Sequence, residues 1–449
     1  MSSLPLARPA GWPRAAFVCA ALVGSGAALV TASARANPGE VTSATRPGAE
    51  EGPVEPRPEM PGRTPPIEDA SALAAFAAAL ARTEAHGGVT RVVHLGDSSI
   101  GMDALPHGLR RRFQRQYGDA GPGFVLLQPH SESYRNRTVD IRVEVAWDSC
   151  FIIRRCRRDG RYGLGGVTVQ SRGRAATSIV PREGRAISRA ELWYLAQPGG
   201  GRARLELGDR AVEIDTSAGA LEDRWHVLEA EPGPHEVRVS ALGSGPVRAY
   251  GVVLENGGPG VVWDTLSMIG AFTHRLLAHD EAHFASQLAR RDPALVVLNF
   301  GGNDLRRIYH GAVDRDALAA ETEALLARVR RAVPGASCLV VGIGDHTRSG
   351  LARVRPRHVD LVLAAQRDAA RRAGCGFWST TDAMGGTGSF EPWQRRGLAS
   401  SDGKHLSERG RRVIAARLHA ALMHAVRANE REPARLTAFG PRGTADRGS

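Results

Sequence analysis

The sequence predicts an α/β protein, a doubly wound parallel sheet of the flavodoxin-like kind, interrupted by an inserted all-β sandwich. Two observations indicate the α/β part. Short apolar segments alternate with longer segments of helical periodicity, and the short segments are apolar throughout, as expected for strands covered on both faces. A third observation indicates the insertion. Between residues 130 and 250 the pattern alternates with a period of two and is broken by glycine-rich turns.

The α/β elements can be assigned in chain order. A first helix carries Leu73, Phe76 and Leu80 on one face, with Asp69 or Ser71 as its cap. The expected strands are Val89–Leu95, Ala294–Phe300, Ser337–Ile343 and Gly376–Ser379, and the expected later helices are Asp103–Tyr117, Asp314–Ala332, Arg357–Ala373 and Ser407–Ala428.

The N-terminus has the pattern of a secretory signal. Arg8 and Arg14 precede an apolar run over residues 15–32, and Ala34 and Ala36 are the small residues that a signal peptidase reads. We therefore expect a signal peptide over residues 1–36 and an exported protein, periplasmic or extracellular. The alternative is an uncleaved membrane anchor. No other apolar run is long enough to span a bilayer, so no stable membrane span is expected after cleavage.

Composition suggests the remaining boundaries. Residues 37–66 are rich in Pro, Gly and Glu and predict a disordered linker. Residues 67–129 and 251–428 form the discontinuous α/β domain, and residues 130–250 form the inserted sandwich. Residues 429–449 are rich in Arg and predict a disordered tail.

Removal of the signal leaves four of the five cysteines, an even number that suggests disulfides in an exported chain. Four cysteines allow three pairings. Pairing Cys150 with Cys156 and Cys338 with Cys375 keeps each bond inside one predicted domain, so we prefer it. The spacings do not suit a structural zinc site.

The formal net charge is +12, and the only lysine is Lys404. A basic surface favours an anionic partner, such as a cell-wall polymer, an acidic glycan, a membrane surface or nucleic acid. The sequence contains no motif that interleaves arginine with aromatic residues as nucleic-acid modules do, so we do not expect a nucleic-acid partner.

Chemistry-bearing residues follow the predicted strands. Ser98 stands in "HLGDSSIG", directly after the first strand. A serine hydroxyl is a poor nucleophile unless a base, usually a histidine oriented by a carboxylate, takes its proton. In "DGKH", Asp402 stands three residues before His405, so their side chains can meet within one turn of chain. We therefore expect Ser98, His405 and Asp402 to form a catalytic site at the carboxyl edge of the sheet.

Acyl transfer also needs donors for the developing oxyanion. The candidates are the backbone N–H of Ser98, the side-chain amide of Asn303 in "GGND" and the backbone N–H of Gly270 in "SMIG". Taken alone, each motif is more often an ordinary turn or a solvated histidine. The combination, in this order and on an α/β background, is what indicates acyl chemistry.

These four segments together resemble the SGNH, or GDSL-type, hydrolases. The resemblance implies a triad of Ser98, His405 and Asp402, an oxyanion hole of Ser98 N–H, Gly270 N–H and Asn303, and no metal or organic cofactor. Further segments resemble the bacterial peptidoglycan O-acetylesterases, which carry an inserted sandwich similar to a carbohydrate-binding module: "FQRQYGDAGPGFV", "YGVVLENGGPGVVWDTL" and "DAMGGTGSFEPW". Two features depart from that group. Ser99 replaces the histidine that often follows the serine, and the glycine block is poor in glycine.

The resemblance predicts a secreted, monomeric serine esterase that removes O-acetyl groups from a glycan polymer, peptidoglycan above all. Three alternatives remain open: an O-acetyltransferase with a sugar hydroxyl as acceptor, an esterase for another acylated carbohydrate or lipid, and a non-catalytic glycan-binding protein. The inserted domain can orient a polymer or only wall the cleft. Trp193, Tyr194 and Trp225 can stack on sugars, although aromatic residues in strands more often pack inward.

Overall fold

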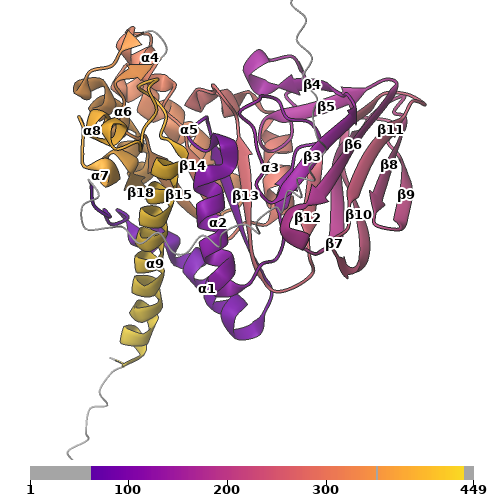
Figure 1. Cartoon of the computed structure of the whole chain (residues 1–449), viewed down its shortest axis with the longest axis horizontal. Coiled ribbons are helices and arrows are strands. Elements are labelled where there is room, and N and C mark those ends of the chain that lie inside the picture. Colours follow the sequence, from indigo (N-terminus) through magenta and orange to yellow (C-terminus); the bar gives the residue numbers. More distant parts are fainter. Residues whose placement is uncertain (1–61, 350–351, 439–449) are drawn as a thin grey trace, which may run out of the picture. The chain divides into compact units, whose positions relative to one another are not determined.

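The computed structural model describes residues 62–349 and 352–438 (Figure 1). The predicted signal peptide, residues 1–36, and most of the predicted linker lie outside the described residues. Within the described part, three sheets carry the fold, and the helices gather around the first of them.

The first sheet, sheet A, is the parallel sheet of the α/β part. Its five strands lie in the order β13-β1-β14-β15-β18, and every neighbouring pair is parallel. The sheet order departs from the chain order, as in a doubly wound sheet, which confirms the predicted fold class. The sequence analysis missed the edge strand β13. The strands are β1 (Val89–Gly96), β13 (Gly260–Ser267), β14 (Leu295–Asn299), β15 (Ser337–Gly342) and β18 (Gly376–Ser379).

Helices cover both faces of sheet A because successive side chains of a strand point to opposite faces. Val92 packs into one core with α1, α2 and α9, and Val93 packs into the other with α3, α5 and α6. Figure 1 shows α2 beside α9. The helices are α1 (Ala74–His86), α2 (Ala104–Tyr117), α3 (Glu281–Arg291), α4 (Asp304–Tyr309), α5 (Arg315–Ala332), α6 (Pro356–Arg372), α7 (Thr380–Met384), α8 (Phe390–Arg395) and α9 (Glu408–Ala438).

The predicted sandwich consists of two antiparallel sheets, B and C, whose facing sides enclose a core of their own. Sheet B contains β2 (Gly123–Val125), β4 (Asp148–Phe151), β5 (Val167–Ser171), β7 (Ile187–Ala196), β10 (Glu222–Gly233) and β12 (Val247–Glu255). Sheet C contains β3 (Val139–Val145), β6 (Arg174–Pro181), β8 (Arg202–Leu207), β9 (Arg210–Asp215) and β11 (Val237–Leu242). A short hairpin, β16 (Arg348–Ser349) with β17 (Ala352–Arg353), stands apart from the sheets.

A buried ion cluster joins the sandwich to the α/β part. Arg291, at the end of α3, donates to Asp264 of β13 at 2.6 Å and to Glu255 of β12 at 2.7 Å. Arg91 of β1 donates to the same Glu255 at 2.9 Å. Side chains of sheet B, including Trp193, also belong to the core that covers one face of sheet A. The two parts therefore share apolar packing and charge pairs.

Three details correct the sequence analysis. Neither Asp69 nor Ser71 caps the first helix through its side chain. Helix α9 continues past Ala428 to Ala438, where a disordered tail was predicted, and Asn429 secures this extension by donating to Ala70 O at 2.9 Å. Within the predicted linker, Pro65 is buried because its carbonyl accepts a hydrogen bond from the indole of Trp378. The domain boundaries inside the chain stay predictions.

The preferred disulfide pairing is present: Cys150 bonds Cys156, and Cys338 bonds Cys375. Trp193 and Tyr194 are core residues, with 1% and 5% of their surfaces exposed, so neither is free to stack on a sugar. Trp225 is half-buried against the edge of Trp193. Among the described helices, none has the length and apolar character needed to cross a membrane.

Candidate functional site

Ser98 stands at the carboxyl edge of sheet A, immediately beyond β1. The turn is held by Asp97, whose N–H donates to Asn299 O of the neighbouring strand β14 at 3.2 Å and whose Oδ1 accepts from Ser99 N at 2.8 Å. The N–H of Ser98 has no hydrogen-bond partner among the described residues. A free donor therefore accompanies the hydroxyl at this strand end.

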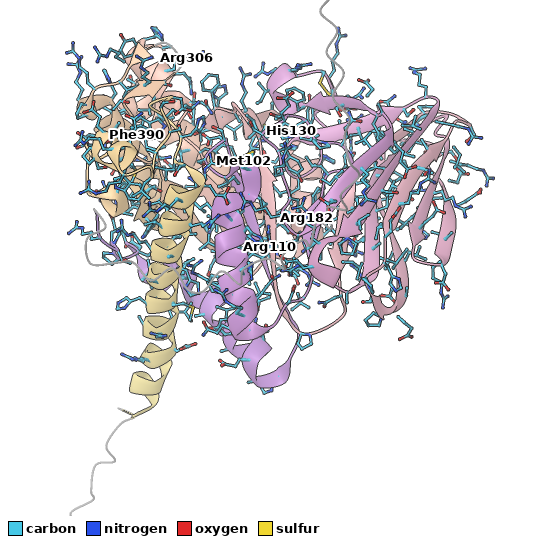
Figure 2. All side chains as sticks on the ribbon, in the orientation of Figure 1. Met102, Arg110, His130, Arg182, Arg306 and Phe390 are labelled. Atoms are coloured by element: carbon cyan, nitrogen blue, oxygen red, sulfur yellow. A yellow bond between two sulfur atoms is a disulfide. The ribbon has the colours of Figure 1, made fainter. Side chains whose placement is uncertain are left out.

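The chain after Ser98 adopts a strained conformation. Met102 and Asp103 have φ values of 62° and 55°, a region that non-glycine residues rarely occupy. The buried carboxylate of Asp103 holds this turn by accepting from Arg110 at 2.9 Å and from Thr265 at 2.8 Å. Figure 2 labels Met102 and Arg110. These bonds tie the segment after Ser98 to α2 and β13, and so fix the course of the chain beyond the serine.

A chain of two hydrogen bonds links Ser98 to the loop before α9. Ser98 Oγ lies 2.8 Å from His405 Nε2, and His405 Nδ1 lies 2.6 Å from Asp402 Oδ2. A carboxylate can only accept, so Nδ1 carries the proton and Nε2 accepts the hydroxyl hydrogen of Ser98. This tautomer is the one in which an imidazole can receive a serine proton.

Asp402 is held as an anion. Its Oδ1 accepts from the N–H groups of His405 and Lys404, each at 2.9 Å, and from the hydroxyl of Ser400. Burial opposes ionisation, but the hydrogen bonds from His405, Ser400 and Lys404 outweigh it and keep the pKa of Asp402 well below its ordinary value. A fixed negative charge beside His405 favours the imidazolium that forms when the histidine takes a proton.

Asn303 joins three segments of the site. It stands between β14 and α4, and its Nδ2 donates to Ala271 O at 2.9 Å and to Asp97 Oδ2 at 3.3 Å. Its Oδ1 accepts from Lys404 Nζ at 3.0 Å. The amide is thus held next to the neighbours of Ser98 and His405. Both hydrogens of this amide already have acceptors. An oxyanion that binds the amide would therefore displace the longer of the two hydrogen bonds, the one to Asp97.

Among the site residues predicted from the sequence, Gly270 has the fewest interactions with the other site residues. No contact joins Gly270 to Ser98 within the described residues, and its φ of 84° is the feature that requires glycine there. Its N–H has no hydrogen-bond partner among the described residues. The next residue, Ala271, accepts the bond from Asn303. The Gly270 loop therefore reaches the site through Asn303.

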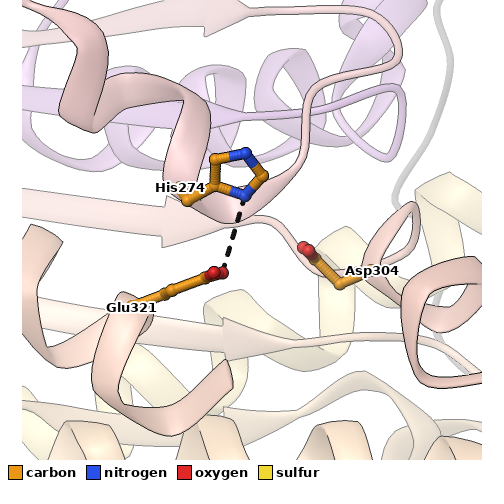
Figure 3. A group of neighbouring side chains, drawn as sticks. All are labelled: His274, Asp304 and Glu321. Atoms are coloured by element: carbon orange, nitrogen blue, oxygen red, sulfur yellow. Dashed lines mark ion pairs between the residues drawn. The ribbon is translucent and has the colours of Figure 1, made fainter. Parts of the chain in front are cut away.

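A charged cluster of His274, Asp304 and Glu321 directly follows the Asn303 loop at the start of α4 (Figure 3). Asp304 Oδ2 accepts from Thr273 N at 2.9 Å and so fastens the segment after Gly270 to the start of α4. His274, Asp304 and Glu321 lie close enough to share a metal ion. Arg307 supplies a positive charge there instead, because it donates to Asp304 at 2.8 Å and to Glu321 at 2.7 Å.

A small pocket opens at Ser98. Its volume is about 50 Å³, and its walls include Ser98, His405, Lys404, His346, Ile343 and Leu406. A water molecule needs roughly 10–15 Å³ by this measure, so a short acyl group fits and a long acyl chain does not. Asn303 and Gly270 do not line this pocket.

Sequence analysis gave no role to two residues of this pocket. His346 follows β15 at the same sheet edge, donates from Nδ1 to Gly344 O at 2.7 Å, and leaves Nε2 as an acceptor. Burial lowers the pKa of His346 to about 4, so this imidazole is neutral at neutral pH. Lys404 could have been singled out, because it is the only lysine and directly precedes His405.

Comparisons with known proteins agree with this fold. The GDSL-like lipase/acylhydrolase family model matches residues 235–413, a range that includes Gly270, Asn303, Asp402 and His405. Ser98 lies outside it because the sandwich separates the first strand from the rest of the domain. A search among curated proteins finds no match.

Among solved structures, one shares this architecture, and two others match with lower scores. A peptidoglycan O-acetylesterase structure is 23% identical with a TM-score of 0.67, and the match covers 80% of this chain and 97% of that one. A lipase/acylhydrolase from Enterococcus faecalis is 16% identical, with a TM-score of 0.29 and coverage of 37% and 77%. A family two carbohydrate esterase from Cellvibrio japonicus is 10% identical, with a TM-score of 0.27 and coverage of 65% and 98%.

Fold, site and family model together define a carboxylic ester hydrolase. More particularly, residues 235–413 match the GDSL-like lipase/acylhydrolase family model, and the likeness to the O-acetylesterase structure includes the inserted sandwich.

Proposed function

We propose that this protein is an exported serine esterase that removes O-acetyl groups from cell-wall peptidoglycan through an acyl-enzyme on Ser98. One observation carries the proposal: Ser98, His405 and Asp402 form a continuous hydrogen-bonded chain at the mouth of a pocket that suits a short acyl group. A serine without a base, or a base without a carboxylate, would not support nucleophilic catalysis.

Acylation uses the proton path that this chain defines. His405 Nε2 takes the proton of Ser98 Oγ as the oxygen attacks the acetyl carbonyl carbon, and a carbon–oxygen bond forms. The negative charge on the carbonyl oxygen is met by the N–H of Ser98, the N–H of Gly270 and the amide of Asn303. His405 then gives its proton to the sugar oxygen, the ester bond breaks, and the sugar leaves with a free hydroxyl.

Deacylation repeats the steps with water. His405 takes a proton from water, which attacks the acetyl-serine carbonyl, and the same donors hold the second oxyanion. The bond to Ser98 Oγ breaks, the serine regains its proton from His405, and acetate leaves. Asp402 stays ionised throughout and stabilises the protonated histidine in both halves.

The substrate assignment has separate support. The pocket volume favours acetyl over a long acyl chain. The peptidoglycan O-acetylesterase structure shares both the α/β part and the sandwich, since it matches over 80% of this chain. Two disulfides and the signal-like N-terminus favour an oxidising compartment outside the cytoplasm, where cell-wall glycan is found.

The test is acetate release from O-acetylated peptidoglycan by the purified chain, with acetylated xylan and p-nitrophenyl acetate assayed in parallel. We expect acetate from peptidoglycan with a kcat/KM at least tenfold above that for xylan. Hydrolysis of p-nitrophenyl acetate with no acetate from peptidoglycan would reject peptidoglycan as substrate. Addition of chitooligosaccharide separates hydrolysis from transfer, because a transferase would move the acetyl group to the added sugar instead of to water.

A further inference from the structure

A second, larger groove borders the ester pocket. It has an accessible volume of about 790 Å³, compared with about 50 Å³ for the pocket, and the two share Asp345 and His346 as a common wall. We call it the arginine groove because Arg353, Arg355 and Arg357 line it. A substrate whose acetyl group enters the pocket can extend into this groove past His346.

The three guanidinium groups have no carboxylate partner among the described residues, and all three residues are exposed. Their situation differs from that of two arginines farther along α6. Arg367 of α6 pairs with Glu68 and Arg372 pairs with Glu323. The positive charge of the groove is therefore left available to a ligand.

The position of Arg355 and Arg357 at the start of α6 increases the positive potential. Arg355 caps the helix, Arg357 lies in its first turn, and that turn contains no acidic residue. The amino end of a helix carries a partial positive charge, and acidic side chains are the ones that stabilise it. Basic residues at this end are unfavourable for the helix by itself, whereas a bound anion would reverse that penalty.

Within the described part of the chain, the remaining titratable groups of the groove form no ion pair with the three arginines. Glu391 of α8 lines the groove but forms no ion pair with the three arginines. Asp345 accepts from the N–H of Phe390, which Figure 2 labels, and burial raises the pKa of this carboxyl. His358 is buried, and burial together with the neighbouring Arg357 and Arg355 lowers its pKa, so it adds no charge at neutral pH.

The groove also offers an aromatic surface. Tyr309, the last residue of α4, has 40% of its surface exposed, which is unusual for so large an apolar ring. The edge-to-face contact with His358, at 5.5 Å between ring centroids, fixes the orientation of the ring. Tyrosine combines an apolar face with a polar tip, the combination that suits a sugar ring.

We propose that the arginine groove binds a carboxylate carried by the glycan next to the acetylated sugar, with Tyr309 against the sugar ring that bears it. This inference rests on the proposed esterase function and specifies its substrate class as an anionic, carboxylate-bearing glycan. In peptidoglycan, the peptide substituents supply such carboxylates. Arginine pairs with a carboxylate through two parallel hydrogen bonds, so the groove gives orientation as well as affinity.

The experiment compares two forms of one ligand. Unacetylated peptidoglycan fragments with free carboxylates, and the same fragments after amidation, are tested as inhibitors of p-nitrophenyl acetate hydrolysis. The parent, the triple variant Arg353→Gln, Arg355→Gln, Arg357→Gln and a control triple variant are compared. The control, Arg142→Gln, Arg172→Gln, Arg210→Gln, removes the same charge from three exposed sandwich arginines that have no carboxylate partner among the described residues.

The measured quantity is the ratio of the two inhibition constants within each protein, so a change in turnover cancels. We expect carboxylated fragments to inhibit the parent and the control at least tenfold more strongly than amidated ones, and the groove variant to show no preference. Any of three results overturns the inference. The parent is inhibited equally by both forms, the parent is inhibited by neither, or the control loses the carboxylate preference as fully as the groove variant does. If the triple variant does not fold, the same ratio of inhibition constants is measured for the three single variants.

The proposed function fails on a different result, the absence of acetate from O-acetylated peptidoglycan while p-nitrophenyl acetate is hydrolysed. A carboxylate preference seen together with that result would leave the groove as an anion site of an esterase with another anionic substrate.

Discussion

The ammonium group of Lys404 donates a hydrogen bond of 3.0 Å to Oδ1 of Asn303. It thereby connects the loop that carries His405 and Asp402 to the loop that follows β14. An amide whose oxygen is held by a cation must present its NH₂ group in the opposite direction, toward Asp97 and Ala271. Lys404 is thus a positioning residue for the oxyanion donor that we assign to Asn303.

Substitution of Lys404 by Met should lower kcat for p-nitrophenyl acetate by about tenfold to a hundredfold, since a hydrogen bond to a charged group contributes about 1.5–3 kcal/mol. KM should change less than twofold. The control is Arg409→Met, which removes an exposed cation near the same loop. A kcat for Lys404→Met equal to that of this control would refute the positioning role.

Asn303→Ala should lower kcat by a hundredfold or more, because the loss of one oxyanion donor typically costs about 3 kcal/mol of transition-state stabilisation. The fold should be preserved, since the Asn303 side chain makes no capping bond to α4. Steady-state kinetics and a circular dichroism spectrum test this. Full activity in a folded Asn303→Ala variant would remove Asn303 from the oxyanion hole.

Asp402→Asn should lower kcat by about ten-thousandfold, because the imidazole loses the acceptor that fixes its tautomer. The low pKa of Asp402 also determines the pH profile. The carboxylate is ionised above its depressed pKa, so it stays charged through the weakly acidic range. The acid limb of the parent kcat should therefore show no titration of Asp402 in that range. Loss of activity through protonation of Asp402 in the weakly acidic range would contradict its assigned charge.

The sequence was sufficient to predict the parallel sheet and to bring Ser98, Asp402 and His405 together. Each lies in a short motif at a strand end or before a helix, where spacing limits the geometry. Lys404 and His346 were not predicted as site residues because the contact of Lys404 with Asn303 and the position of His346 in the pocket at Ser98 arise only in the folded chain. No local pattern distinguishes such residues from a solvated cation or a buried histidine.

The edge strand β13 was missed for a related reason. It follows β12 after a short turn, and β12 belongs to a different sheet. Both strands are buried along their whole length, and a turn separates them, so the pattern is that of two successive strands and carries no signal for the change of sheet. Helix α9 continues beyond Ala428, and the long-range bond from Asn429 to Ala70 at that point is one that a composition argument does not contain.

The buried cluster around Glu255 predicts acid sensitivity. Burial opposes its charge, but the bonds from Arg91 and the charge of Arg291 outweigh burial and lower the pKa of Glu255 from 4.5 to about 2. A depressed carboxyl pKa stabilises the fold above the unfolded-state pKa, and this stabilisation disappears as the pH falls toward 2. The contribution of this group is about 3 kcal/mol at neutral pH.

Glu255→Gln should therefore unfold in urea with a free energy about 3 kcal/mol below that of the parent at pH 7, and the difference should shrink between pH 5 and pH 2. The control is Glu213→Gln, which removes an exposed ion pair with Arg202 and should cost less than about 1 kcal/mol. A difference between Glu255→Gln and the parent that is constant over this pH range would contradict the linkage.

The most direct test of the central claim is acetate release from O-acetylated peptidoglycan by the parent and by Ser98→Ala, at equal concentration and with matching circular dichroism spectra. The account predicts steady release by the parent and, for the variant, a rate no higher than the uncatalysed background. Release by Ser98→Ala at the rate of the parent would contradict a nucleophilic role for Ser98 and with it the acyl-enzyme mechanism.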